Sequence, residues 1–523
     1  MISPVINWYF KQRSQDLREN LDRANLKQEE LFVELIERLS NTRYGEKYQI
    51  SEKTTYEDFC ARVPVVVYED LKPWIDRNMA GEQQLLWPSD IVWYAKSSGT
   101  TSNVAKFIPM SFESLEYNHY ECSRETLTQY CGFFPETEIF KGKGLLIGGS
   151  HRVNELNQNA FYGDLSAVLM NHLPAWVNWK STPDMEIAMM ENWEEKLEKM
   201  AQSVYQENVT SMSGVPTWTI VLLNRLLEIT GKNNILEIWP NLELFLHGGV
   251  SFEPYKDQFR SLIPSDKMHY FETYNASEGF FGLQASPNKS DLLLMTHHGI
   301  FYEFYPVSKG PDFIIPLSDV IVGVNYAMVI TTVGGLWRYI IGDTIIFTDT
   351  KPYTFKITGR TKLFINAFGE ELVIENAETA IAIASKETAA IVTDYSAGPI
   401  YLSDQADAGH EWLIEFSKEP TSLEEFIRVL DSALMAANED YQAKRQGDIV
   451  MKLPKVISVP KNTFHDWLKS KGKLGGQNKV PRLNNDRKVI EEIKASMGLI
   501  YWLKSYFCLL KTYVRSHSTT LGG

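Results

Sequence analysis

A run of hydroxyl side chains around one glycine is the part of this sequence most suited to binding phosphate. Residues 97–109 read Ser-Ser-Gly-Thr-Thr-Ser-Asn-Val-Ala-Lys-Phe-Ile-Pro and follow an apolar, strand-like run. Gly99 permits a tight turn, Lys106 supplies a mobile positive charge, and backbone N–H groups can join the hydroxyl groups in surrounding an anion. The hydroxyl groups belong to Ser97, Ser98, Thr100 and Thr101. Because these residue types also dominate surface turns, this stretch alone supports phosphate binding and an ordinary turn about equally.

A carboxylate follows a second expected strand. Residues 274–282 come directly after the apolar run 268–273, and in them Glu278 stands between Ser277 and a glycine. A carboxylate at the end of a strand, beside a hydroxyl group, is suited to hold Mg²⁺ over phosphate oxygens. Taken alone, this segment is somewhat better explained as a surface turn with a solvated Glu, because Glu is mostly exposed in proteins.

Two further segments could complete a nucleotide site. Gly248 and Gly249 follow an expected strand, where paired glycines either admit a flat ring against the backbone or simply make a turn. Residues 337–343 end in Gly-Asp, and Asp343 can accept hydrogen bonds from a ribose diol, with Arg338 nearby as a phosphate clamp. On its own, this last segment is better explained by an ordinary surface ion pair.

A basic, glycine-rich loop lies near the C-terminus. Residues 469–482 read Lys-Ser-Lys-Gly-Lys-Leu-Gly-Gly-Gln-Asn-Lys-Val-Pro-Arg. Most charge runs are simply solvated. A mobile loop on a small C-terminal domain could instead carry Lys479 over an active site.

The pattern of apolar and turn residues along the chain predicts the helices and strands that must position these groups. Helical periodicity over residues 15–40 indicates an amphipathic opening, and short apolar runs separated by turn residues make 242–375 rich in strands. A compact pattern of helices and strands follows. We therefore expect a mixed α/β fold with an N-terminal domain over 1–359, a C-terminal domain over 360–496 and an extra tail over 497–523.

Charge, cysteine spacing and apolar runs indicate which classes of protein this chain can belong to. The net charge of −14 on 523 residues argues against a nucleic-acid-binding surface over the whole molecule. The 4 cysteines form no Cys-x-x-Cys pair, which favours free thiols in a reducing compartment. We find neither the apolar core of a signal peptide nor an apolar run of about 18 residues, so we expect a cytoplasmic protein without a transmembrane segment.

The order of these groups along the chain resembles that of adenylate-forming enzymes. More closely, it resembles the Gretchen Hagen family, the auxin-responsive acyl acid amido synthetases and their bacterial relatives. The resemblance extends from about residue 10 to 496, and the motifs that carry it lie at 97–109, 274–282, 337–343 and 478–482. It implies a large N-terminal domain of β-sheets, helices and a distorted β-barrel, with a small mobile C-terminal domain.

The resemblance also implies the reaction and its participants. ATP and a carboxylic acid would form an acyl-adenylate and pyrophosphate, and the amine of an amino acid would then displace AMP to give an amide. Asp343 would bind the ribose, Glu278 would carry Mg²⁺, and Arg360 would lie at a hinge between the domains. Lys479 would contact phosphate or the acyl-adenylate. The adenine would be bordered by Gly249 and Tyr274, and the phosphates would be held by Ser98, Thr100, Thr101 and Lys106.

Two departures from the family keep other functions open. Asn103 stands where the family usually has a second glycine in the phosphate loop. The tail beyond Ser496 is outside the family's usual end; it is either an amphipathic helix on a membrane or partner or, in the interpretation we favour, a packed or loosely ordered extension. The alternatives are a thioester-forming ligase of the CoA type and a catalytically weakened nucleotide- or acid-binding protein. The acid is not determined, although the aromatic residues Phe161, Tyr162 and Trp218 are compatible with an aryl or indole acid.

Overall fold

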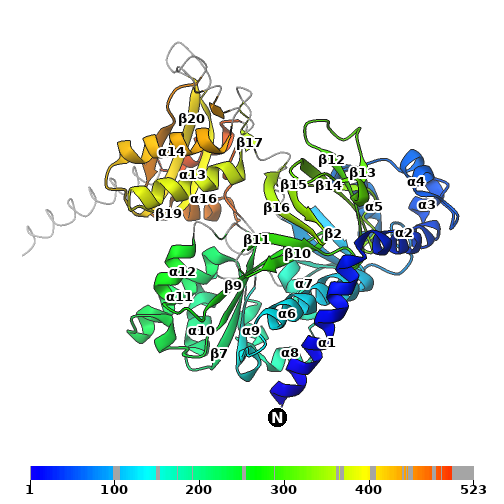
Figure 1. The fold of residues 1–523 in the computed structure, drawn as a ribbon, viewed down its shortest axis with the longest axis horizontal. Coiled ribbons are helices and arrows are strands. Elements are labelled where there is room, and N and C mark those ends of the chain that lie inside the picture. The colour runs from blue at the N-terminus through cyan, green and yellow to red at the C-terminus, as the bar shows by residue number, and fades with distance from the viewer. Residues whose placement is uncertain are drawn as a thin grey trace, which may run out of the picture. The chain divides into compact units, whose positions relative to one another are not determined.

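The chain folds into two compact units, which Figure 1 shows in a computed structural model. The first comprises Met1–Thr361 with Gly475–Gln477, and the second comprises Lys362–Leu474 with Asn478–Gly523. The residues that the structure describes are 2–97, 106–148, 153–173, 175–190, 193–249, 252, 255–287, 289–360, 364–365, 370, 372–400, 408–438, 441–442, 445, 451–473, 479–484 and 486–497.

A 12-stranded sheet forms the centre of the first unit. Its strands, in spatial order, are β13 (Ile315–Pro316), β12 (Ile300–Pro306), β14 (Asn325–Thr332), β15 (Tyr339–Thr350), β16 (Tyr353–Arg360), β11 (Lys289–Leu294), β10 (Gly279–Ser286), β9 (His269–Ala276), β8 (Leu244–Gly248), β7 (Val209–Gly214), β3 (Lys143–Ile147) and β6 (Ser181–Thr182). Neighbours from β3 to β9 are parallel, and those from β9 to β13 are antiparallel. The strand-rich region expected over 242–375 is confirmed.

The expected distorted barrel is not found among the described strands. The large sheet is open, because β13 and β6 stand at its two edges and the strand order does not return on itself. The mixed α/β class is confirmed, since helices cover both faces of the parallel part of this sheet.

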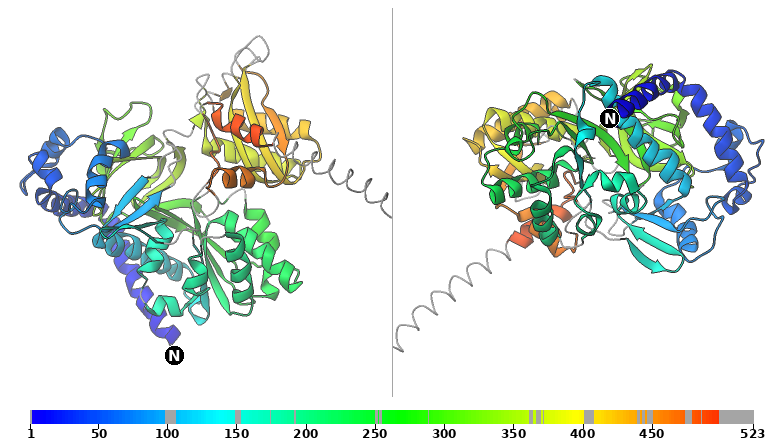
Figure 2. Two further views of the ribbon diagram at one scale, coloured as in Figure 1. Left: turned by 180° about the vertical axis from the view of Figure 1, so that it is seen from behind. Right: turned by 90° about the horizontal axis from the view of Figure 1, so that it is seen from below.

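Adjacent residues of one strand show how those faces are covered. Successive side chains of a strand point to opposite faces, and Leu244 and Phe245 of β8 accordingly belong to different cores. Phe245 packs in a core with side chains of α10 (Trp193–Val204), α11 (Pro216–Thr230) and α12 (Lys256–Leu262). Leu244 packs in a core with α1 (Ile2–Asp22) and α6 (Glu121–Phe133), which lie on the other side of these strands (Figure 1, Figure 2). Burial on both faces is typical of parallel sheets.

A second, four-stranded sheet carries the hydroxyl-rich stretch. Its order is β2 (Lys106–Met110), β1 (Trp93–Ser97), β5 (Ala160–Gly163) and β4 (Asn154–Asn157). Strands β1 and β2 are antiparallel, with Ser97 directly opposite Lys106. Residues 98–105 therefore join the two strands of a hairpin. The helix expected over 111–130 follows as a π-helical segment, η1 (Ser114–Tyr120), that continues into α6.

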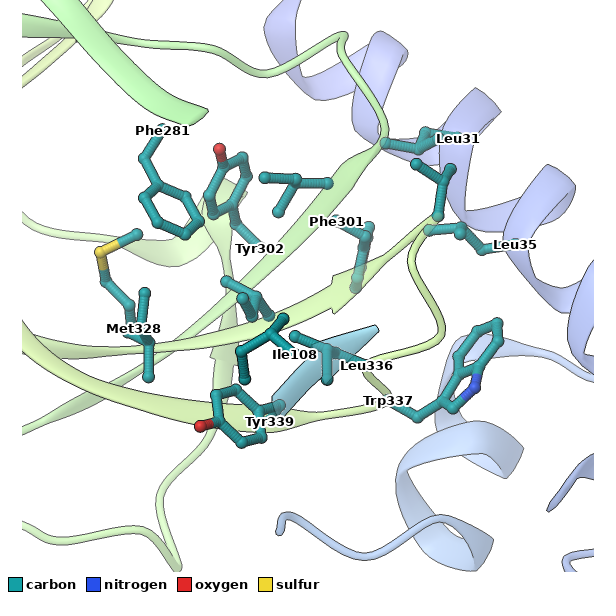
Figure 3. Close-up of a cluster of buried hydrophobic side chains, with 14 of the residues drawn as sticks. Leu31, Leu35, Ile108, Phe281, Phe301, Tyr302, Met328, Leu336, Trp337 and Tyr339 are labelled. Carbon is teal, nitrogen blue, oxygen red and sulfur yellow. The ribbon is translucent and has the colours of Figure 1, made fainter. Parts of the chain in front are cut away.

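One buried cluster ties the small sheet to the antiparallel half of the large one. Figure 3 shows Ile108 of β2 among side chains of the large sheet, including Tyr302 of β12, Met328 of β14 and Tyr339 of β15. Leu31 and other side chains of α2 (Ala24–Ser40) pack in the same cluster. The position of the β1–β2 hairpin is thereby fixed by packing against the strand that begins at Tyr339.

The described part of the second unit contains a three-stranded sheet with helices packed against it. The sheet has the order β19 (Ile391–Ile400), β20 (Gly409–Lys418) and β21 (Lys455–Val459). The helices are α13 (Ile374–Glu387), α14 (Leu423–Ala437) and α16 (Thr463–Ser470). These elements confirm the pattern of helices and strands expected after residue 360.

Among the described helices, none combines the length and apolarity that crossing a membrane requires. The extra tail expected over 497–523 lies outside the described residues, apart from Met497. Cys60, Cys122 and Cys131 are free thiols, as expected.

Candidate functional site

Glycines end neighbouring parallel strands at one edge of the large sheet. Gly214 ends β7, Gly248 ends β8, and Gly148 follows β3. A side chain at Gly248 would meet the carbonyl oxygen of Thr273 at 2.4 Å, so the close approach of β8 to β9 requires glycine. The next residue, Gly249, has φ of 79°, a conformation that glycine adopts at no steric cost. Ligands of α/β proteins typically bind beyond the carboxyl ends of parallel strands, so this edge is the place to look for the site.

The predicted magnesium ligand lies at the same edge. Ala276 of β9 pairs with Gly279 of β10, which leaves Ser277 and Glu278 as the two residues of a hairpin turn. Ser277 is buried, and Glu278 is partly exposed. A partly exposed carboxylate at a strand end offers the oxygen ligands that Mg²⁺ prefers.

Two predicted residues from distant strands meet directly. The Tyr274 hydroxyl group on β9 donates a hydrogen bond to Oδ2 of Asp343 on β15, and both side chains are buried. Asp343 stands opposite Arg360 in the pairing of β15 with β16. The side chain of Arg360 lies outside the described part of the chain, so the structure places its backbone beside Asp343 and says nothing of its charge.

A histidine that sequence reasoning missed supports this strand. His119 on η1 is buried, and its Nδ1 lies 3.0 Å from Oδ1 of Asn275, the neighbour of Tyr274. Burial lowers the pKa of His119 to about 4, so the ring is neutral at physiological pH. Nothing in the sequence distinguishes His119 from an ordinary residue of an amphipathic helix.

Lys106 is the first residue of β2 and points toward the start of β15. Its Nζ lies 3.4 Å from the hydroxyl oxygen of Tyr339 and 5.6 Å from the centre of the Tyr68 ring. The Tyr68 hydroxyl in turn accepts a hydrogen bond of 2.8 Å from the backbone N–H of Phe107. Tyr68, which the sequence analysis did not single out, thus contacts both the charge of Lys106 and the strand that carries it.

Arg338 does not have the position of a phosphate clamp. It is buried, and its Nε and Nη2 donate to the two carboxylate oxygens of Glu303 at 3.0 and 2.9 Å. Its Nη1 donates to the carbonyl oxygens of Cys60 and Val63. Four of the five N–H donors of the guanidinium are therefore taken by protein groups. This corrects the expectation from sequence: Arg338 holds residues 60–63 against β12.

A charged residue inside an apolar strand could have revealed that pair. Glu303 interrupts the run Ile300–Phe304 of β12, and its side chain is fully buried. Because Glu is almost never fully buried without a partner, its position predicts a buried cation. The sequence does not say which one.

The second unit anchors the chain on the C-terminal side of Lys479. Lys479 is exposed, whereas its neighbour Val480 is buried. Arg482 pairs with Glu378 through Nη1 and Oε1, and its guanidinium carbon lies 5.0 Å from the centre of the Tyr395 ring. The segment that follows Lys479 is therefore fixed to the body of this unit.

Several predicted residues cannot be placed. Ser98, Gly99, Thr100 and Thr101 lie outside the described residues, as does Asn103, and of Ser97 only the backbone is described. The aromatic residues proposed for the acid have packing partners. Phe161 stacks on Trp93 with 5.0 Å between ring centres, and Tyr162 lies edge-on to Phe107 at 5.3 Å. Trp218 packs against the core under α11.

Comparisons with known proteins agree with this layout. Sequence models of three GH3 family domains match the chain: the N-terminal domain over residues 13–268, the central domain over 293–360 and the C-terminal domain over 375–488. The chain is 23% identical to the indole-3-acetic acid-amido synthetase GH3.3 of Arabidopsis thaliana, over 87% of this chain and 88% of that protein. It is 24% identical to the jasmonoyl–L-amino acid synthetase JAR4 of Nicotiana attenuata, over 87% of this chain and 90% of that protein.

A solved structure has the same fold at lower identity. The GH3.15 acyl acid amido synthetase superposes with a TM-score of 0.77 at 17% identity, covering 93% of this chain and 96% of that one. At this identity the likeness establishes the fold alone.

Proposed function

The chain belongs to the GH3 family, and from that premise we propose that it is an ATP-dependent ligase that joins a carboxylic acid to an amino acid. The acid would first be activated as an acyl-adenylate. Of the two relatives above, one is named an amido synthetase and the other a jasmonoyl–L-amino acid synthetase, and each matches this chain over most of its length. Family domains alone do not show that the site is intact, so the proposal depends on the residues themselves.

The contact between Tyr274 and Asp343 is the observation that carries the proposal. It joins β9 to β15, and Asp343 lies four residues along β15 from Tyr339, the residue that Lys106 contacts. Three segments that are far apart in the sequence therefore converge on a phenol, a carboxylate and an ammonium group. These are the groups that the family assigns to adenine, ribose and phosphate respectively.

The remaining roles follow from position. We propose that the hairpin loop 98–105 wraps the phosphates, with Lys106 at its end, and that Gly248 and Gly249 let the adenine approach the backbone. Glu278 would hold Mg²⁺ against the phosphate oxygens, which fits its partly exposed carboxylate in the β9–β10 turn. Ser277 lies next to it.

The proposed reaction requires the protein to position the reactants and to stabilise charge, and it requires no covalent bond to the protein. In the first step, a carboxylate oxygen of the acid attacks the α-phosphorus of ATP, and pyrophosphate leaves. In the second step, the amine nitrogen attacks the acyl carbon, AMP leaves, and the nitrogen loses a proton. Both steps move negative charge onto phosphate oxygens, and nearby cations stabilise that charge in the transition state. We propose Lys106 and Lys479 for this task, and we assign none to Arg338.

A direct assay separates amide formation from the alternatives. The full-length protein is incubated with Mg·ATP, a panel of aryl, indole and fatty acids, and either mixed amino acids or CoA, and the products are identified by mass spectrometry. The proposal predicts an amide together with AMP for at least one acid. A thioester with no amide would assign the chain to the CoA-type alternative, and neither product with ATP still bound would indicate a weakened homologue. The cytoplasmic location and the absence of nucleic-acid binding stay predictions.

A further inference from the structure

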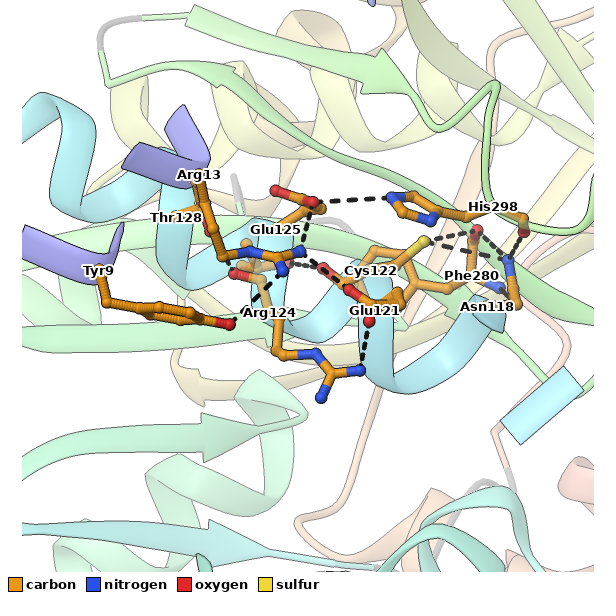
Figure 4. Close-up of polar contacts among 11 residues, drawn as sticks. Tyr9, Arg13, Asn118, Glu121, Cys122, Arg124, Glu125, Thr128, Phe280 and His298 are labelled. Atoms are coloured by element: carbon orange, nitrogen blue, oxygen red, sulfur yellow. Dashed lines mark hydrogen bonds and ion pairs between the residues drawn. The ribbon is translucent and has the colours of Figure 1, made fainter. Parts of the chain in front are cut away.

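Two adjacent histidines and a glutamate gather away from the candidate nucleotide site. His297 and His298 lie in the turn between β11 and β12, and Glu125 lies on α6. Figure 4 shows Glu125 and His298 side by side. One donor atom from each of the three side chains can be chosen so that all three atoms lie within 4.8 Å of one another. Glu125 has only 6% of its side chain exposed, and His298 has 12%.

Four polar atoms of this cluster are buried without a hydrogen-bond partner. No hydrogen bond is made by Oε2 of Glu125, by either ring nitrogen of His297, or by Nε2 of His298, and each of these atoms is shielded from solvent. Unsatisfied buried polar atoms are rare in folded proteins and cost free energy when they occur. Four of them gathered in one cluster are therefore suited to a single ligand that can bind them together.

We propose that Glu125, His297 and His298 bind one divalent transition-metal ion, and that Zn²⁺ matches them best. Imidazole nitrogens and a carboxylate oxygen are the ligands that Zn²⁺ takes in proteins. The three donor atoms lie within 4.8 Å of one another, and Nε2 of His298 lies 3.8 Å from Oε1 of Glu125, the oxygen that Arg13 also contacts. Ligand atoms of a tetrahedral Zn²⁺ with bonds of ~2.0–2.1 Å are separated by roughly 3.4 Å, so small side-chain movements suffice. Three protein ligands leave the fourth position to water.

Arg13 supports the carboxylate and does not exclude the ion. Its Nη2 lies 2.6 Å from Oε1 of Glu125 and 2.8 Å from Oε2 of Glu121, so it occupies one oxygen of Glu125 and leaves the other without a partner. Metal-binding carboxylates are commonly hydrogen-bonded on their second oxygen. The positive charge of Arg13 is shared between two carboxylates, which limits its repulsion of a cation at Glu125.

The ion would join α6 to the turn between β11 and β12, and the ion pair of Arg13 with Glu125 links α1 to the same carboxylate. Arg13 belongs to α1, Glu125 to α6, and the histidines to a turn that α6 already contacts, because Nδ2 of Asn118 donates to the carbonyl oxygen of His298 at 2.7 Å. The residues proposed for ATP lie on β2, β9 and β15. We therefore assign the ion a role in stability, separate from catalysis.

Metal titration of the full-length protein tests this assignment. The protein is stripped with a chelator, dialysed and titrated with Zn²⁺ by calorimetry, and with Co²⁺ while the visible absorption of tetrahedral cobalt is followed. We expect one Zn²⁺ per chain, a raised Tm on adding Zn²⁺, and a cobalt spectrum of imidazole and carboxylate ligation. His298→Ala should weaken binding at least ~10–100-fold, the range found even for residues that only support metal ligands.

Two further variants separate the loss of a metal ligand from misfolding and from the loss of an unrelated histidine. Glu125→Gln retains the shape of the side chain and an oxygen for Arg13, yet removes the anionic ligand, so it should fold and bind Zn²⁺ weakly. His465→Ala removes an exposed histidine of α16 and should bind Zn²⁺ as the wild type does. The assignment is overturned if the wild type takes up no stoichiometric Zn²⁺, if Zn²⁺ leaves its Tm unchanged, or if His298→Ala and Glu125→Gln bind as tightly as His465→Ala.

Discussion

The phenolic hydroxyl group of Tyr274 donates a hydrogen bond to the carboxylate of Asp343, a residue 69 positions further along the chain. The contact spans from β9 to β15, two strands that are separated by β10, β11 and β16 in the large sheet. Both side chains are buried, so the hydrogen bond orients the carboxylate within a region of low dielectric, where such bonds are strong. This relationship suggests that Tyr274 sets the position of the carboxylate that we propose for the ribose.

Removing the phenol should therefore weaken ATP binding. In Tyr274→Phe the ring stays and the donor is lost, and we expect the KM for ATP to rise by a factor of ~5–30, equivalent to about 1–2 kcal/mol. Steady-state kinetics with ATP as the varied substrate measure it. Tyr353→Phe removes a phenol that donates to Asn25 instead, and it should leave this KM unchanged. Equal effects of the two variants would argue against the proposed role of Tyr274.

The buried pair of Arg338 and Glu303 should contribute to stability. Arg338→Met leaves the Glu303 charge buried without its main partner, so we expect unfolding in urea to become easier by about 3–5 kcal/mol. Adding Glu303→Leu should recover much of that loss, because it removes the stranded charge. Arg225→Met breaks a surface pair with Glu198 and should have a much smaller effect on unfolding, because exposed ion pairs contribute little to stability. If Arg338→Met were fully stable but unable to use ATP, Arg338 would be a phosphate ligand after all.

Replacing Lys479, an exposed lysine of the second unit, should lower catalytic activity and leave stability unchanged. Lys479→Ala removes a charge from a segment that Arg482 anchors, and we expect kcat for product formation to fall ~10–100-fold, the worth of a charge-assisted hydrogen bond. Urea unfolding should be unchanged. Lys461→Ala, another exposed lysine of this unit, is the matched control and should retain the activity of the wild type. Full activity in Lys479→Ala would remove this residue from the site.

Stability should fall in acid partly because of His119. Its pKa is about 4 in the folded protein and about 6.5 in the unfolded chain. Between these values the unfolded state binds more protons, so the free energy of unfolding decreases as the pH falls from 6.5 to 4, by about 3 kcal/mol for this group. Above pH 6.5 the ring is neutral in both states and contributes no slope. Unfolding of His119→Asn and wild type, measured across this range, should differ in slope, whereas His465→Ala should follow the wild type.

The local pattern of apolar and polar residues predicted much of this fold. The features that it did not predict depend on pairing between distant strands. Short apolar runs predicted the strand-rich region over 242–375, because each run buries its own face of a sheet. The hairpin of β1 and β2 was not foreseen, since polar residues conceal the return strand that begins at Lys106. The distorted barrel implied by the family is not found among the described strands; whether a sheet closes depends on how distant strands pair, which a local pattern does not show.

In the candidate site, too, residue type and position predicted some residues, and the others depend on contacts between distant parts of the chain. Tyr274, Asp343 and Lys106 were singled out by type and position; in the structure Tyr274 contacts Asp343, and Lys106 contacts Tyr339 on the same strand as Asp343. Arg338 was assigned incorrectly because a sequence cannot show that Glu303 already binds its guanidinium. His119 and the histidine pair at 297–298 escaped notice, since only the folded chain brings them beside Asn275 and Glu125.

Acid-dependent exchange of labelled pyrophosphate into ATP tests the central claim most directly. It reports adenylation alone, before any acceptor is chosen. We predict that at least one carboxylic acid stimulates exchange by the wild type, and that Glu278→Gln shifts the Mg²⁺ concentration needed for half-maximal exchange upward at least about tenfold, because a charged metal ligand is lost. Absence of exchange with every acid, in a folded protein that binds ATP, would contradict the assignment as an adenylate-forming ligase.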